Sequence, residues 1–116
     1  FKCDLDDAAR GAAGATHGAV ERGLDEQMRL LQHSVDLCRR LGTDLIRIFS
    51  FWRRGPITPD LEDRIARALT RPCEIDERAG VTLLLEIEHA CTLGTGAETA
   101  RMIEKIGSPA LKMLWD

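Results

Sequence analysis

The chain has 116 residues, of which 44% are hydrophobic and 30% are charged, a composition typical of one small globular domain or of part of a larger one. Lys and Arg number 16 against 19 Asp and Glu, and the resulting net charge of -3 argues against a nucleic-acid partner, which requires a cationic surface. No stretch approaches the ~18 consecutive apolar residues of a membrane span, so no membrane partner is expected.

The four cysteines are spread along the chain, without a CxxC motif or a neighbouring histidine pair. Such isolated cysteines are typical of reduced thiols in a cytosol rather than of a zinc cluster or a disulfide framework, so we expect a cytoplasmic protein. The sequence lacks the basic and then apolar order of a signal peptide, and it does not begin with Met. Because it opens on FKCDLDD and closes on LWD, we expect it to be a central part of a longer protein.

The first predicted element is a loop or lid segment at residues 1–23, where Ala and Gly are frequent and no period is sustained. A helix is predicted over 24–41, ended by Gly42, because apolar residues recur at helical spacing and charged residues occupy the other face. The apolar stripe consists of Leu24, Met28, Leu31, Val35 and Cys38, widened by Leu30, Leu37 and Leu41.

Three strands and two more helices are predicted beyond this point, and the strands are 44–51, 81–88 and 110–116. The second helix begins at Thr58-Pro59-Asp60, which supplies a cap, a first-turn proline and an acid near the helix start. We expect Pro72 to kink or split this helix. The third helix begins at Thr95, which forms a capping box with Glu98, and runs through Ile106.

Helices and strands that alternate in this way imply a parallel sheet with crossover connections. Each predicted strand has one face that tolerates polar residues, whereas an open sheet between two layers of helices requires two apolar faces. In the second strand the apolar face is Val81, Leu83, Leu85 and Ile87, and the other is Thr82, Leu84, Glu86 and Glu88. The predicted fold is therefore α/β, a partial (β/α)8 TIM barrel with parallel strands alternating with helices.

Three acids, Glu86, Glu88 and Asp116, fall at the carboxyl ends of predicted parallel strands. Active sites of barrels are built at this rim, and acids gathered there without a metal would repel one another. A divalent cation with hard oxygen ligands resolves this repulsion. The alternative is that the acids are simply solvated at the strand ends.

The stretch VTLLLEIEHACTLGTGAETARMIEKIGSPALKMLWD resembles the middle of a sugar phosphate isomerase/epimerase of the xylose isomerase-like TIM barrel superfamily. In that family a strand that ends in LLLEN precedes a Gly-Thr-Gly loop, a helix and a strand that ends in WDPGN. LGTDLIRIFSFW resembles the preceding strand, and the likeness covers about residues 24–116.

The resemblance implies that Glu86 binds a metal and acts as an acid/base, and that Asp116 is a second metal ligand. The cation would be Mn, Mg, Co or Zn, and two more ligands, a His and a Glu, would lie beyond residue 116. This chain departs from the family at Ile87, where Asn is usual, and at Pro72, inside a helix that is normally uninterrupted.

Arg47, Trp52 and Glu88 are candidate substrate-binding residues. Arg47 points inward from an apolar strand, so it binds a substrate oxygen or the Glu86 carboxylate, or belongs to a structural ion pair. Trp52, with the two arginines after it, either walls the mouth of the site or belongs to a plain surface loop. The Gly94-Thr95-Gly96 amides are candidates for holding an anion, although capping alone explains Thr95.

These features together predict an isomerase or epimerase that moves a proton next to a carbonyl of a sugar or polyol, with a divalent metal. A homo-oligomer is compatible with this prediction. One alternative is a zinc endonuclease of the same superfamily, which would need more His ligands and a basic face. The other is a non-catalytic α/β binding module with surface acids at the rim.

Overall fold

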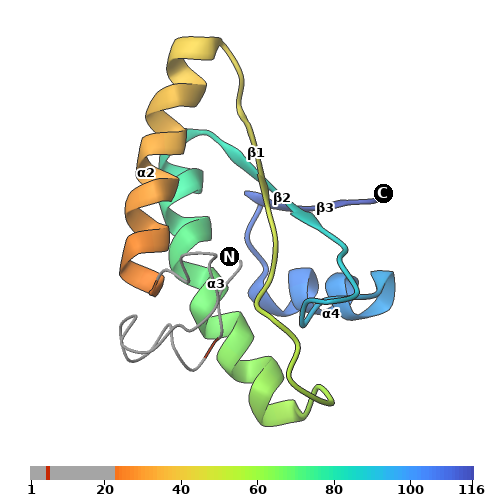
Figure 1. Cartoon of the computed structure of the whole chain (residues 1–116). Coiled ribbons are helices and arrows are strands. Elements are labelled where there is room, and N and C mark those ends of the chain that lie inside the picture. The colour runs from red at the N-terminus through yellow and green to blue at the C-terminus, as the bar shows by residue number, and fades with distance from the viewer. Residues whose placement is uncertain (1–4, 6–22) are drawn as a thin grey trace.

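A computed structural model describes Leu5 and residues 23–116 of the chain; the predicted loop or lid at 1–23 lies outside them except for Leu5 and Gly23. The elements alternate as predicted (Figure 1). They are α2 (Leu24–Leu41), β1 (Leu45–Ile48), α3 (Pro59–Ala79), β2 (Thr82–Glu86), α4 (Gly96–Ile106) and β3 (Leu111–Leu114). No helix in the described part of the chain has both the length and the apolar character needed to cross a bilayer.

Local signals at the helix ends act as the sequence predicts. The Thr58 side chain accepts a hydrogen bond from the Leu61 amide at the start of α3, and Thr95 forms a reciprocal capping box with Glu98 at the start of α4. α2 ends at Gly42, whose φ of 70° lies in the left-handed region that favours glycine. These caps fix where α2 ends and where α3 and α4 begin.

The strands form one parallel sheet in the order β1-β2-β3. Each strand is shorter than predicted, because a residue belongs to a strand only where its backbone pairs with a neighbouring strand. Thr92 donates from its amide to the Phe51 carbonyl at 2.7 Å, and Cys91 donates to the Glu88 carbonyl at 2.8 Å. Phe51 and Glu88, both predicted to lie in strands, therefore belong to the loops at the rim.

The helices cover one face of the sheet, and α2 and α3 lie side by side along the strands (Figure 1). Leu83 and Leu85 of β2 are fully buried there, against α3 residues such as Ile65. Burying a side chain of this size contributes about 1.5–3 kcal/mol to stability. On the opposite face Arg47 is exposed. This one-sided burial is the pattern that led to the barrel prediction.

Two expectations about the helices were wrong. α3 is one continuous helix of 21 residues through Pro72, so Pro72 does not split it; a kink there stays a prediction. Proline costs roughly 3 kcal/mol inside a helix, and the buried stripe of α3 on both sides of Pro72 offsets that cost by packing on the sheet. Leu37 and Leu41 do not widen the buried stripe of α2, because they are 51% and 70% exposed.

A carboxyl group lies in the interior away from the rim. Asp76, near the end of α3, is fully buried, and neither of its oxygens has a hydrogen-bond partner within the described part of the chain. Burial raises the pKa of Asp76 to about 7. Burial is also the main reason why the pKa of the Cys73 thiol, one turn earlier, is raised to about 11. At neutral pH this thiol is therefore uncharged.

Candidate functional site at the strand ends

Glu86 is the last residue of β2, and its side chain is only 12% exposed. Nη1 of Arg47, from the adjacent strand β1, lies 3.1 Å from Oε2 of Glu86. This contact with the carboxylate is one of the roles considered for Arg47. The two residues are diagonal neighbours, because Arg47 is in register with Leu84 and Glu86 is two residues further along β2.

The Arg47–Glu86 contact is an ion pair without a hydrogen bond. Oε2 of Glu86 is buried, yet among the described residues no donor reaches it with hydrogen-bond geometry. A buried carboxylate oxygen normally accepts hydrogen bonds, and one that does not has free lone pairs for another ligand. The site thus offers a hard oxygen donor of the kind that divalent cations prefer.

Asp116 lies two residues beyond Leu114, which is the last residue of β3 and the register partner of Glu86. The ring of Trp115 lies against Gly96 at the start of α4, on the helix side of the sheet: a Cβ on Gly96 would be 2.5 Å from Cζ3 of Trp115. Asp116 therefore follows a largely exposed side chain that lies near the start of α4, at the end of the strand that pairs with β2. Among residues 5 and 23–116, no three His, Cys, Asp or Glu side chains form a cluster able to hold a metal ion.

Glu88 lies outside β2 and takes part in the turn that follows it. Its Oε1 accepts a hydrogen bond from the Ala90 amide at 3.2 Å and lies 3.1 Å from Nδ1 of His89. The prediction that Glu88 continues the strand beyond Glu86 on the same face was therefore wrong. A role for Glu88 in substrate binding stays a prediction.

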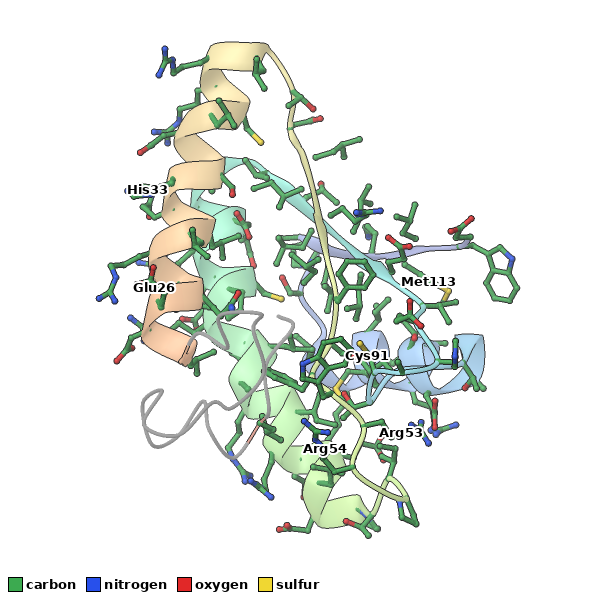
Figure 2. The ribbon with its side chains drawn as sticks, in the orientation of Figure 1. Glu26, His33, Arg53, Arg54, Cys91 and Met113 are labelled. Atoms are coloured by element: carbon green, nitrogen blue, oxygen red, sulfur yellow. The ribbon has the colours of Figure 1, made fainter. Side chains whose placement is uncertain are left out.

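Trp52 and Arg53 join the loop after β1 to the loop after β2. Trp52 forms an isolated antiparallel bridge with Cys91. The guanidinium of Arg53 donates to the carbonyl oxygens of Cys91 and Thr92, each at 3.2 Å, and forms an ion pair with Glu98 of α4. Figure 2 shows Arg53 and Arg54 on the segment that leads from β1 to α3, with Cys91 nearby. The segment is therefore more ordered than a plain surface loop.

Glu98 is the hub of this network. Burial alone would raise the pKa of its carboxyl, but the hydrogen bonds from Arg53 and Thr95 outweigh burial and lower the pKa below its usual value. The amides of Gly94 and Thr95 both donate to Oε2 of Glu98 at 3.1 Å. Since these two amides already bind a carboxylate, the arrangement agrees with capping rather than with an anion site.

Sequence reasoning missed the pairing of Arg53 with Glu98. The capping-box spacing pointed to Thr95 as the partner of Glu98, and this contact exists. The second partner comes from a different loop, 45 positions away, and no local spacing indicates it. Asp76 was also missed, although its spacing of three residues from Cys73 places it on the buried stripe of α3.

A family model described as xylose isomerase-like TIM barrel matches residues 14–116. A solved structure of an L-ribulose 3-epimerase is similar, with 26% identity and a TM-score of 0.67 over 99% of this chain and 39% of the epimerase. The IolI protein with a bound zinc atom has 17% identity and a TM-score of 0.67, over 77% of this chain and 33% of that one.

A xylose isomerase-like TIM barrel protein from Mycobacterium smegmatis in complex with magnesium is 14% identical, with a TM-score of 0.63 over 77% of this chain and 34% of the other. The chain thus spans roughly a third of the length of these three proteins. No curated protein sequence matches it. The parallel sheet with helices on one face and the family match over 14–116 agree, and the chain belongs to the xylose isomerase-like TIM barrel family.

Proposed function

We propose that this chain is the central part of a metal-dependent isomerase or epimerase that acts on a sugar or polyol. The observation that carries the proposal is the buried Oε2 of Glu86, which lies at the carboxyl end of a parallel strand and accepts no hydrogen bond from the described residues. In barrels of this kind the reaction takes place at that end of the strands. The similarity to an L-ribulose 3-epimerase supports the class of reaction.

Glu86 and Asp116 are the proposed metal ligands from this chain, and the remaining ligands would come from other strands of a complete barrel. A bound divalent cation would stabilise negative charge that develops on substrate oxygens. Zinc in the IolI protein and magnesium in the mycobacterial protein make both ions reasonable, alongside manganese and cobalt.

The proton would be moved by the carboxylate of Glu86, at a carbon next to the substrate carbonyl. Because Glu86 is only 12% exposed, its carboxylate is partly shielded from water, and such shielding strengthens its interaction with a bound substrate. Arg47 on the same face would contact a substrate oxygen, and Trp52 and Glu88 would border the mouth.

The test is metal content measured in the full-length protein that the gene encodes. Glu86→Gln and Asp116→Asn should each lower bound divalent metal, by elemental analysis, and abolish interconversion of a panel of ketoses, with circular dichroism unchanged. Glu104→Gln, at an exposed carboxylate on α4, is the matched control and should keep both properties. Full metal content in both rim variants would mean that these carboxylates are not metal ligands.

A further inference from the structure

The guanidinium of Arg47 has two partners at once. It lies 3.1 Å from Oε2 of Glu86, and its Cζ lies 5.2 Å from the centroid of the Phe49 ring. A guanidinium at this distance from an aromatic face is attracted by the ring quadrupole. Phe49 therefore provides a place for the Arg47 cation that does not depend on Glu86.

The two members of the ion pair differ in solvent exposure. The side chain of Arg47 is 60% exposed, whereas that of Glu86 is 12% exposed. No hydrogen bond locks the pair, so only Coulomb attraction, weakened by solvent around Arg47, holds the guanidinium to the carboxylate. Arg47 can leave Glu86 at low cost, while the largely buried Glu86 carboxylate requires some positive charge beside it.

We propose that Arg47 is an exchangeable counterion: it neutralises Glu86 when no divalent cation is bound, and moves away from Oε2, staying on Phe49, when a cation binds. The inference rests on the proposed function, because it takes Glu86 to be a metal ligand. Arg47 is then a positioning residue that neutralises Glu86 in the empty site and lowers the affinity of the site for metal. A fixed structural ion pair would also lower the affinity, but that affinity would not depend on Phe49.

The experiment measures the affinity for Mn²⁺ by isothermal titration calorimetry on the metal-stripped full-length protein. Arg47→Met should tighten binding about three- to tenfold, since it removes both a competitor for Oε2 and a nearby positive charge; the range is modest because Arg47 is exposed. Phe49→Leu keeps Arg47 but removes its alternative partner, and should weaken binding by about two- to fivefold.

Arg71→Met is the matched control. The Arg71 side chain is also 60% exposed and also forms one ion pair between elements, with Asp25 at 3.4 Å, but on the outer helices. The Arg71→Met variant removes the same unit of charge, but on the outer helices and not at the strand ends, so it should leave Mn²⁺ affinity unchanged. If Arg47→Met folds poorly, the Phe49→Leu variant still decides the matter, because a structural role for Arg47 predicts no change in affinity there.

The outcomes separate the two proposals. If the protein binds Mn²⁺, Glu86→Gln abolishes binding, and Phe49→Leu leaves the affinity unchanged, the counterion inference fails while the proposed function stands. If Glu86→Gln binds Mn²⁺ as tightly as the unaltered protein, or if that protein binds none, the metal assignment fails and the inference falls with it.

Discussion

Replacement of Asp76 by asparagine should stabilise the protein at neutral and alkaline pH. In the unfolded chain the pKa of Asp76 is near the ordinary value of 3.8, and in the folded protein burial raises it to about 7. The folded state therefore binds the proton more tightly, and stability falls as the pH rises from about 4 to about 7 and then levels off. The shift of roughly 3 pKa units corresponds to a loss of up to about 4 kcal/mol above pH 7.

The Asp76→Asn variant carries no titrating group at this position, so its stability should lose this pH dependence. Urea unfolding of the full-length protein, followed by circular dichroism from pH 5 to pH 8, measures the effect. The variant should be more stable than the unaltered protein at pH 8 by about 2–4 kcal/mol, and this difference should shrink by roughly 2–3 kcal/mol at pH 5. Glu74→Gln, at an exposed carboxylate in the same helix, is the control and should keep the pH dependence of the unaltered protein.

An Asp76→Asn variant that is no more stable at pH 8, with an unchanged pH dependence, would contradict this expectation. It would mean that the Asp76 carboxyl is charged in the folded protein and is compensated by a group outside the described residues. The Cys73 thiol cannot produce the effect, because the raised pKa of about 11 keeps it neutral throughout this range.

Three further predictions concern the sheet and the rim. The 116-residue chain alone should self-associate, because β1 and β3 have unpaired edges in the described structure and Trp115 is 75% exposed. Light scattering after gel filtration measures this, and a monodisperse monomer that unfolds cooperatively would contradict it. The Glu88→Gln variant should retain its metal and lose activity only in part, about 10- to 100-fold, through weaker substrate binding. A metal-free Glu88→Gln protein would argue against Glu86 as the metal ligand. Arg53→Met should lower the free energy of unfolding by about 2–3 kcal/mol in urea, because the Cys91 and Thr92 carbonyls and the Glu98 carboxylate lose their donor. An unchanged unfolding midpoint would show that the loops after β1 and β2 stay joined without Arg53.

The helices and their ends were the most predictable part of this fold. Thr58, Gly42 and the Thr95–Glu98 box act within a few residues of themselves, so the sequence contains the whole signal. The order of elements and the one-sided burial of the strands followed from periodicity, which is also local. Strand ends were less predictable, because a ladder stops where its partner turns away, as at Glu88.

The rim was predictable only in part for the same reason. Alternation along the strands indicated that Arg47 and Glu86 share a face, and the structure brings them together. That Arg53 ties both loops to Glu98 depends on contacts across 38 to 45 positions, which no spacing in a single sequence encodes. Pro72 shows the opposite error, in which a strong local signal is overridden by packing.

The contact between Gly96 and Trp115 has a consequence for how this sequence can vary. Gly96 does not need a left-handed backbone, but a Cβ there would lie 2.5 Å from Cζ3 of Trp115, so a larger residue requires the indole ring to move. Positions 96 and 115 should therefore vary together: a relative with a larger residue at position 96 should carry a smaller or differently placed residue at position 115. Because Trp115 directly precedes Asp116, such a paired exchange would also change the position of the Asp116 carboxylate at the end of β3.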